Sequence, residues 1–333
     1  MKAAQLRKYN KENIKLEIID LPKPVPTDTQ VLIKVNAAGV NPVDNMITRG
    51  EVKLLLPYSL PLTAGNEVVG IVEEVGAKVS DFKAGDRVFA RLPLRSIGAF
   101  AEYVAVEENA LALVPSYLND EQAACVPLTA LTVMQAMDLM RVEAGKTIFI
   151  SGGTGGVGAM AIPIAKAKGL KVITNGNATN KERVLALGAD QFIDYKTQDY
   201  AEVVSNVDYV LDTLGGSHTQ KQISILKAGG HIVSLKGVPN KKFAKRFGLS
   251  AWKQFLIGLV GRKLDKLAEE KDATYDFIFV ESNGKQLQEV AGIFSQLRIQ
   301  PSIDTVYDFK DINKALEKVA NGNSRGKTLI VFK

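Results

Sequence analysis

The feature that most constrains the fold is a glycine-rich turn set between a strand and a helix. Residues 147–151 read T-I-F-I-S, a short apolar run typical of a buried strand, and G-G-T-G-G-V-G follows at 152–158. Residues 157–169, which overlap the end of this run, read V-G-A-M-A-I-P-I-A-K-A-K-G and predict a helix that ends at Gly169. A glycine-rich turn in this position predicts a strand–helix–strand unit of a parallel sheet that binds a dinucleotide.

Glycine is needed at three of these positions, each for a different physical reason. Gly153 permits the tight turn, Gly155 lets the backbone approach a pyrophosphate, and Gly158 lets the helix pack against the strand. The helix N-terminus then offers unpaired N–H groups and a partial positive charge to the phosphates. The alternative is a glycine-rich turn without a ligand. We predict that the dinucleotide is bound by Gly153, Thr154, Gly155, Gly156, Val157 and Gly158.

The second strand of this unit indicates which dinucleotide is bound. A site for NAD usually ends this strand with an acidic residue that binds the ribose 2′-hydroxyl. Here residues 174–177 read T-N-G-N, and Lys181 and Arg183 follow. A 2′-phosphate favours cations and hydroxyl or amide donors over a carboxylate. We therefore predict NADP(H), with Thr174, Asn177 and Lys181 near its adenosine end; the alternative for Lys181 and Arg183 is a solvated helix face.

Two domains are expected from the 333 residues, because one core rarely serves such a length. Residues 121–301 alternate apolar strands with helices, which predicts an α/β fold with a doubly wound parallel sheet of Rossmann type. Residues 1–120 consist mainly of short β-branched runs between Gly, Pro and Asp, which favours a β-rich barrel domain. The tail, 302–333, ends in the strand-like run T-L-I-V-F and is expected to return to the first domain.

Composition excludes several classes of protein. The single cysteine, Cys125, cannot form an internal disulfide, and with His218 and His231 it is a poor supply of ligands for a transition metal. Cys125 has apolar neighbours, so we interpret it as a small buried hydrophobic residue. The net charge of +6 is too dispersed to predict nucleic-acid binding. We see neither a membrane-spanning run nor a secretory signal and expect a cytoplasmic protein.

Several motifs together resemble a known family. N-A-A-G-V-N-P-V-D occurs at 36–44, A-G-N-E-V-V-G-I-V-E-E-V-G at 64–76, V-P-L-T-A-L-T at 126–132 and R-G-K at 325–327. With the glycine-rich turn, they resemble the medium-chain dehydrogenase/reductase superfamily, and within it the zinc-free quinone oxidoreductase branch that includes zeta-crystallin. The resemblance covers essentially the whole chain. It implies a GroES-like barrel domain beside the Rossmann domain.

The resemblance also implies a chemistry without zinc. Zinc members of the family hold the metal with a cysteine where Asn41 stands and a histidine where Asn66 stands. Amides are poor zinc ligands beside thiolate and imidazole, so we expect no metal. Hydride transfer to a quinone or an α,β-unsaturated carbonyl does not need a metal ion. The negative charge that develops spreads onto a conjugated oxygen, where one hydrogen-bond donor can stabilise it. We therefore expect an NADPH-dependent reductase of quinones, enones or enals.

Individual residues are assigned by the same resemblance. Asn41 is expected beside the nicotinamide ribose and the substrate, or else as a loop amide that bonds its own backbone. Asp44 is expected to orient that loop, Thr129 to face the nicotinamide, and Glu67 to be structural. Tyr58 is the only tyrosine of the active-site loop and a candidate proton donor. Further contacts to the cofactor are expected from Tyr195, Leu235, Arg325 and Lys327, although Arg325 and Lys327 could also be surface residues.

Residues 239–271 form an unusual basic segment with Trp252 and a helical pattern of apolar residues. We expect a lid helix or a dimer contact there; a helix that lies on an anionic membrane through 241–266 is the less favoured alternative. The strand-like run Y-D-F-I-F-V at 275–280 offers an edge for a homodimer. Two other functions remain open, namely a non-catalytic dinucleotide sensor or nucleic-acid-binding protein, and an enoyl-thioester reductase.

Overall fold

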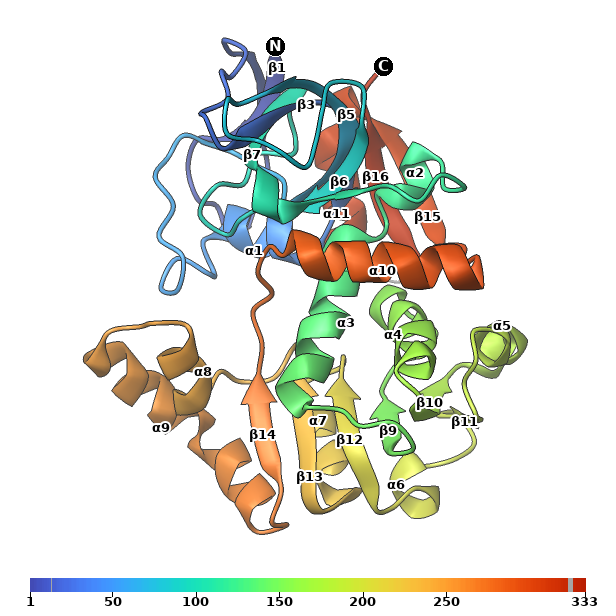
Figure 1. Cartoon of the computed structure of the whole chain (residues 1–333). Helices are drawn as coiled ribbons and strands as arrows, with labels where there is room; N and C mark the ends of the chain where they lie inside the picture. The colour runs from blue at the N-terminus through green and yellow to red at the C-terminus, as the bar shows by residue number, and fades with distance from the viewer. Residues whose placement is uncertain (13, 323–325) are drawn as a thin grey trace. The chain divides into compact units, whose positions relative to one another are not determined.

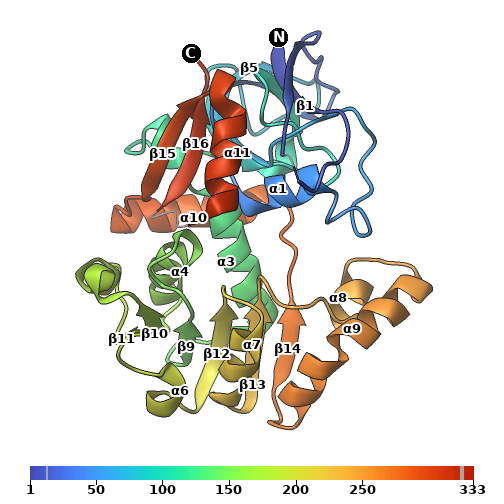
Figure 2. The same cartoon turned by 180° about the vertical axis from the view of Figure 1, so that it is seen from behind.

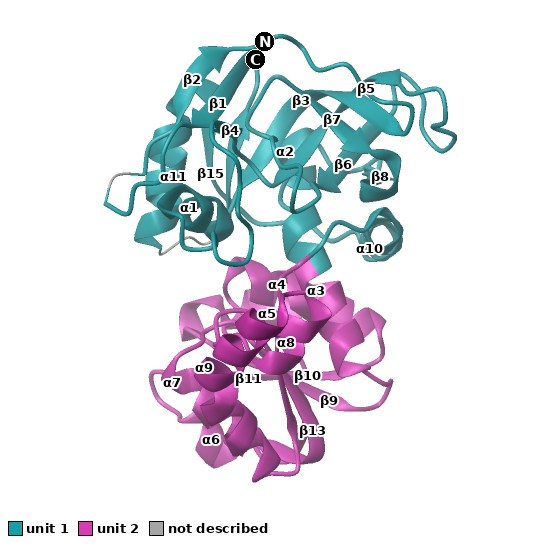
Figure 3. Ribbon diagram, turned by 90° about the vertical axis from the view of Figure 1, so that its left-hand side faces the viewer, with its two compact units in different colours: residues 1–131, 281–333 teal, residues 132–280 magenta. Residues whose placement is uncertain are grey.

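The computed structural model describes residues 1–12, 14–322 and 326–333. The chain divides into two compact units (Figure 3): unit 1 comprises Met1–Leu131 and Glu281–Lys333, and unit 2 comprises Thr132–Val280. The sequence placed these divisions at 121 and 301. Unit 2 therefore begins 11 residues later (132 against 121) and ends 21 residues earlier (280 against 301) than expected.

Packing of one helix explains the second difference. Helix α10 (Gly284–Leu297) follows the parallel sheet in the chain, but it packs against β8 (Leu111–Leu113) of unit 1. The hydroxyl of Tyr117 donates to the carbonyls of Phe294, at 2.8 Å, and Ile299, at 2.7 Å. Sequence order alone could not reveal that α10 belongs to the earlier unit.

Unit 1 is built on two sheets (Figure 1). The smaller sheet has the order β2-β1-β4, and the larger has the order β15-β16-β3-β5-β6-β8 with β7 paired to β3. The strands are β1 (Lys2–Leu6), β2 (Glu17–Asp20), β3 (Gln30–Val40), β4 (Leu62–Thr63), β5 (Glu67–Val75), β6 (Arg87–Arg91), β7 (Tyr103–Glu107), β15 (Ile303–Asp308) and β16 (Lys327–Val331). The β-rich domain expected from the short β-branched runs of residues 1–120 is confirmed.

The tail returns to unit 1, as predicted. Strand β16 pairs antiparallel with β3, and Thr328 lies opposite Val40. This register brings the residue before Thr328 next to the residue after Val40, which matters for the site. Unit 1 also contains α1 (Pro42–Arg49), η1 (Glu108–Ala110), α2 (Asp120–Ala123), η3 (Phe309–Asp311) and α11 (Ile312–Asn321), with α11 packed against β16 (Figure 2).

Unit 2 is a doubly wound Rossmann domain. Its parallel sheet has the order β11-β10-β9-β12-β13-β14, so β14 lies at an edge, and helices cover both faces (Figures 1 and 2). The strands are β9 (Thr147–Ile150), β10 (Lys171–Gly176), β11 (Gln191–Asp194), β12 (Val207–Asp212), β13 (Leu226–Ser234) and β14 (Thr274–Phe277). The helices are α4 (Gly156–Ala167), η2 (Ala178–Asn180), α5 (Lys181–Ala186), α6 (Tyr200–Val203), α7 (Ser217–Ser224), α8 (Lys241–Arg246) and α9 (Ala251–Glu269).

Helix α3 (Pro127–Met140) begins in unit 1 and continues in unit 2. Among the described residues, the stretch Asp120–Met140 is long and apolar enough to cross a membrane by length and composition. Its apolar window is 78% buried, however, as expected for the core helix of a soluble protein. We therefore interpret α3 as part of the core.

Candidate active site

The glycine-rich turn of unit 2 is shaped by close packing. A Cβ atom added to Gly153 would lie 2.9 Å from the Cγ2 of Thr174, and one added to Gly158 would lie 2.5 Å from the Cα of Gly153. Real Cβ atoms do not approach other atoms so closely, so both positions require glycine. The predicted roles of Gly153 in the turn and Gly158 in helix packing are therefore consistent with the geometry.

The other side of the turn is open. A Cβ on Gly156 would meet no atom within 4 Å, and one on Gly155 would meet only the Gly152 carbonyl oxygen at 3.4 Å. Helix α4 begins after Gly155 without a side-chain cap. Its first N–H groups therefore lack a side-chain partner, and such a helix N-terminus attracts phosphate. These residues fit the phosphates of a dinucleotide.

Two residues at the end of β10, Thr174 and Asn175, pack against the turn or bond to it. Only Thr174 was predicted from the sequence. Thr174 is fully buried, and its hydroxyl donates to the carbonyl of Ile150 at 2.5 Å. Because this hydroxyl already links two strands, the geometry does not favour the expected contact of Thr174 with the cofactor, which stays a prediction. Asn175, which the sequence analysis passed over, accepts the N–H of Gly152 at 2.8 Å through its side chain and the N–H of Gly153 at 3.0 Å through its carbonyl.

Basic residues lie next to the turn. The Arg183 guanidinium donates to the carbonyl oxygen of Thr154 at 2.8 Å, so this cation is fixed against the phosphate-binding loop. Lys181 is exposed at the start of α5. The Asn177 side chain accepts the N–H of Thr179 at 3.2 Å and caps η2. Arg183 is thus the more firmly positioned of the two cations that the sequence singled out.

Two further predicted contacts lie after neighbouring strands. Tyr195 follows β11, is 56% exposed, and donates its backbone N–H to the Gly176 carbonyl at 3.2 Å. Leu235 follows β13 and donates its backbone N–H to the carbonyl of Asp212 at 2.9 Å. Both therefore lie at the carboxyl ends of the parallel strands, where ligands bind in such sheets. Their contact with a cofactor stays a prediction.

A second buried polar group organises this edge of the sheet. The carboxylate of Asp212, at the end of β12, is fully buried and accepts the N–H of Gly215 at 2.9 Å, the hydroxyl of Thr219 at 2.6 Å and the hydroxyl of Ser234 at 2.6 Å. No sequence motif marks Asp212 as a functional residue. Only its place directly after a buried strand could have drawn attention to it.

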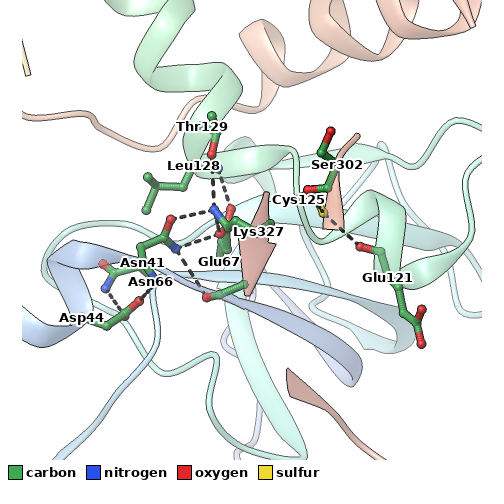
Figure 4. A network of polar contacts seen from close by, with 11 residues as sticks. Asn41, Asp44, Asn66, Glu67, Glu121, Cys125, Leu128, Thr129, Ser302 and Lys327 are labelled. Atoms are coloured by element: carbon green, nitrogen blue, oxygen red, sulfur yellow. Dashed lines mark hydrogen bonds and ion pairs between the residues drawn. The ribbon is translucent and has the colours of Figure 1, made fainter. Parts of the chain in front are cut away.

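In unit 1, residues far apart in the sequence form one hydrogen-bonded cluster (Figure 4). We call it the amide–lysine network; it comprises Asn41, Asp44, Asn66, Glu67, Thr129 and Lys327. Asn41 precedes α1, and its amide donates to Glu67 Oε1 at 2.7 Å while its amide oxygen accepts from the Lys327 ammonium at 2.6 Å. The side chain of Asn41 thus joins two elements, and its amide also donates to the Gly39 carbonyl of its own loop at 3.4 Å.

Lys327 lies inside this network and not on the surface. Its ammonium forms an ion pair with Glu67 and also donates to Thr129 Oγ1 at 3.2 Å; its side chain is only 11% exposed. Pairing of β16 with β3 brings it beside Asn41. A lysine has three N–H donors, and Asn41, Glu67 and Thr129 accept all three. Lys327 therefore positions the others, while its contact with a cofactor phosphate is untested. Arg325 lies outside the described residues.

Glu67 is the fixed anion of the network. It is fully buried and accepts the backbone N–H of Leu128, in the first turn of α3, at 2.8 Å. A Cβ on Gly39 would lie 2.7 Å from Glu67 Cδ and 2.8 Å from Lys327 Cε, so glycine is required for this carboxylate to reach the lysine. These contacts are those of a structural residue.

Asp44 and Asn66 form the other end of the network. Asp44 accepts the backbone N–H of Asn41 at 2.7 Å and the amide of Asn66 at 2.7 Å, which fixes the start of α1 as expected. Burial raises the pKa of the Asp44 carboxyl to about 7, although these two hydrogen bonds lower it. The amide oxygen of Asn66 is buried and has no hydrogen-bond partner in the part of the chain that the structure describes.

These donors do not fit a zinc ion. The groups at positions 41 and 66 are amides, and the Lys327 ammonium, bonded to the Asn41 oxygen, would repel a second cation. Zinc prefers thiolate and imidazole ligands. Within the described residues there is no cluster of three His, Cys, Asp or Glu side chains that could hold a metal.

The candidate proton donors differ in what they already contact. Thr129 is 93% buried; its hydroxyl accepts from Lys327 and donates to no group of the described chain, so its proton remains to be donated. The hydroxyl of Tyr58 donates to the carbonyl of Leu94 at 2.7 Å, and burial raises its pKa to about 12. This geometry favours Thr129 over Tyr58. Burial also raises the pKa of the Cys125 thiol to about 12, as suits a buried, unreactive residue.

Comparison with known proteins supports the fold type assigned to each of the two units. Residues 27–116 match the family described as alcohol dehydrogenase GroES-like domain, and residues 187–330 match the one described as zinc-binding dehydrogenase. NAD(P)H oxidoreductase RTN4IP1, mitochondrial, of Mus musculus is 32% identical, over 96% of this chain and 84% of that protein. The human quinone oxidoreductase is 28% identical, over 94% of this chain and 92% of that protein.

A solved structure has the same fold along its whole length. The quinone oxidoreductase from Coxiella burnetii gives a TM-score of 0.83 at 28% identity and covers 100% of this chain and 99% of that one. The chain therefore belongs to the medium-chain dehydrogenase/reductase superfamily, in its quinone oxidoreductase branch. It is an NAD(P)H-dependent oxidoreductase.

Proposed function

We propose that the protein is an NADPH-dependent reductase of quinones or α,β-unsaturated carbonyls that works without zinc. The observation that carries the proposal is the amide–lysine network at the positions where zinc members of the superfamily hold their metal. Asn41 and Asn66 replace the two ligands, and the Lys327 ammonium bonds Asn41. Without a Lewis acid, the acceptor must spread the negative charge itself, as a conjugated carbonyl does.

Preference for NADPH is supported by charge. Residues 174–177 carry no carboxylate, Arg183 is bonded to Thr154 of the turn, and Lys181 is exposed nearby. A 2′-phosphate would be attracted by these cations. The bound cofactor would supply the hydride. The groups that would hold it are the open backbone at Gly155 and Gly156 and the uncapped start of α4.

Thr129 is the protein group proposed to stabilise charge on the substrate oxygen. Its hydroxyl oxygen is fixed by Lys327, so the O–H can donate to an acceptor without reorganising. Lys327 is fixed in turn by Glu67, which Gly39 and the N–H of Leu128 hold in place. Tyr58, with its hydroxyl already committed, is not assigned this role.

A substrate panel with one pair of variants tests the proposal. NADPH consumption is followed with several quinones, enones and enals, and zinc content is measured on the same sample. Thr129→Val should lower kcat about 100-fold, the usual effect of removing one donor to a developing oxyanion, and leave KM for NADPH unchanged. Thr129→Ser retains a hydroxyl and should recover most of the activity. Stoichiometric zinc, or NADPH binding without turnover on any acceptor, would refute the proposal.

A cytoplasmic location and a homodimer remain proposals of the same kind. The RTN4IP1 relatives are named as mitochondrial proteins, and that description applies to them. The homodimer proposal rests on β14 being the last strand of its sheet, although the Tyr275 and Phe277 carbonyls of that strand already accept from Asn240 and Arg246. Light scattering of the purified protein would decide between monomer and dimer.

A further inference from the structure

Helix α9 carries a row of large apolar side chains that the protein does not cover. We call the five residues concerned the α9 face; their exposed fractions are 57% for Trp252, 64% for Phe255, 45% for Leu256, 53% for Leu259 and 67% for Val260. Residues three and four apart in a helix lie on the same side. The exposed apolar residues therefore form one continuous stripe.

The helix is held to unit 2 by its opposite side. Ile257, Gly261, Leu264 and Ala268 are buried, and Leu264 and Ala268 belong to the core cluster under the sheet. A Cβ on Gly261 would lie 2.7 Å from Asn240, so the helix packs closely there. The stripe is therefore additional to the apolar residues needed to fold the helix onto the domain.

A buried asparagine fixes the orientation of the stripe. Asn240 is fully buried; its amide donates to Asp265 of α9 at 2.7 Å and to the Tyr275 carbonyl of β14 at 3.1 Å, and its oxygen accepts the N–H of Phe243 in α8 at 2.9 Å. It thus ties α8 and α9 to the edge strand (Figure 1). The α9 face is presented by a rigid support and not by a loop.

The surroundings of the α9 face are strongly basic. The basic segment 239–271 contains nine Lys and Arg residues against three acidic residues, Asp265, Glu269 and Glu270. Arg262, Lys263 and Lys266 are exposed on α9. A groove beside Phe255 and Leu259 is lined by three cations, Lys241, Arg262 and Lys266, and by two carboxylates, Asp265 and Glu269. Two copies meeting through this face would bring like charges together, which disfavours a self-contact. The partner must accept apolar side chains and carry negative charge.

We infer that the α9 face docks onto the surface of an anionic lipid bilayer. A helix that lies in a bilayer interface buries Trp, Phe and Leu among the acyl chains and places Lys and Arg at the head groups. The α9 face and its basic surroundings provide both kinds of residue. This reverses the order of the alternatives drawn from the sequence, because the structure leaves the apolar side uncovered. The inference is independent of the reaction catalysed.

The only tryptophan of the chain lies in this face, so its fluorescence reports docking directly. The full-length protein is mixed with vesicles of phosphatidylglycerol or of phosphatidylcholine. Phosphatidylglycerol should shift Trp252 emission to the blue and co-sediment the protein, brominated acyl chains should quench the emission, and phosphatidylcholine should do neither. Phe255→Glu with Leu259→Glu should abolish the emission shift, the co-sedimentation and the quenching. Leu297→Glu on α10, at a side chain 48% exposed, is the matched control.

Two double variants, each of which removes two positive charges, measure the electrostatic contribution to docking. Arg262→Gln with Lys263→Gln should lower partitioning into phosphatidylglycerol about 30-fold, since each basic residue at an anionic surface contributes about fivefold. Lys11→Gln with Lys285→Gln removes the same charge from exposed positions of unit 1 and should have little effect. NADPH turnover with a soluble quinone should be unchanged in all four variants, which separates loss of docking from loss of folding.

Three results would overturn the inference. One is the absence of both an emission shift and co-sedimentation with phosphatidylglycerol. Another is blue-shifted emission without vesicles in a dimer that Phe255→Glu separates, which would identify a second copy as the partner. The third is binding to polyglutamate in preference to vesicles, which would identify an acidic polypeptide.

Discussion

The phosphate-binding turn of unit 2 and the amide–lysine network of unit 1 are built in different ways. The turn lies within 152–158, and its shape depends on close contacts that only residues without a Cβ atom can make. The next strand and helix support it through Asn175 and Arg183. The network joins residues from position 41 to position 327 and depends on buried charge. A site whose shape depends on glycine packing can therefore be predicted from a short stretch of sequence. A buried polar site is assembled only by the tertiary fold.

Removing the cation of the network should have the largest effect on stability. Lys327→Met leaves the fully buried Glu67 carboxylate without its ion-pair partner, and breaking such a pair costs about 3–5 kcal/mol. The free energy of unfolding in urea measures this loss. Adding Glu67→Gln to Lys327→Met should recover part of it, because no uncompensated charge remains. Equal instability of the single and double variants would contradict the role assigned to charge.

Filling the turn should have a smaller, steric effect. Gly158→Ala places a Cβ 2.5 Å from the Cα of Gly153, and overpacking of this kind costs about 1–3 kcal/mol. Thermal unfolding and calorimetric titration with NADPH measure stability and binding. Gly156→Ala is the control for stability, since its Cβ would meet nothing within 4 Å. If Gly156→Ala weakens NADPH binding without changing stability, the open side of the turn is the phosphate site.

The pH dependence of stability should distinguish the two sites. The pKa of Asp44 is about 7 in the folded protein against an ordinary 3.8. Between pH 4 and 7 the folded state therefore holds a proton that the unfolded state has lost, so the Asp44 contribution falls as the pH rises, by at most about 1.4 kcal/mol per pH unit. Urea unfolding at pH 5 and 6 should show a steeper fall for the wild type than for Asp44→Asn. Identical slopes would mean that Asp44 is ionised throughout.

Cofactor preference should show the smallest effect. Lys181→Gln removes an exposed cation near the end of β10, and we expect KM for NADPH to rise about fivefold while KM for NADH stays unchanged, as for the loss of a contact worth about 1 kcal/mol. Steady-state kinetics with both nucleotides measure the ratio. Lys285→Gln, at an exposed position of α10, is the matched control. Equal changes for NADPH and NADH would place Lys181 away from a 2′-phosphate.

Much of the fold could be predicted from local pattern. The strand at 147–151, the glycine-rich turn and the helix after it appear where the sequence placed them, because apolar period and glycine sterics act over a few residues. The hydroxyl of Thr174 shows the limit of local pattern. It could serve a ligand or a neighbouring strand, and only the pairing of β10 with β9 shows that it serves the strand.

The sequence by itself determined the two fold types, the return of the tail and the glycine-rich turn, since these follow from periodicity and from backbone freedom. It also supplied the amides at positions 41 and 66. The tertiary structure alone decided that Lys327 meets Asn41, Glu67 and Thr129, that Tyr58 donates to Leu94, and that α9 turns apolar residues outward. The physical reason is that hydrogen-bond partners and burial depend on which surfaces meet in space, and residues separated by hundreds of positions carry no local signal of meeting.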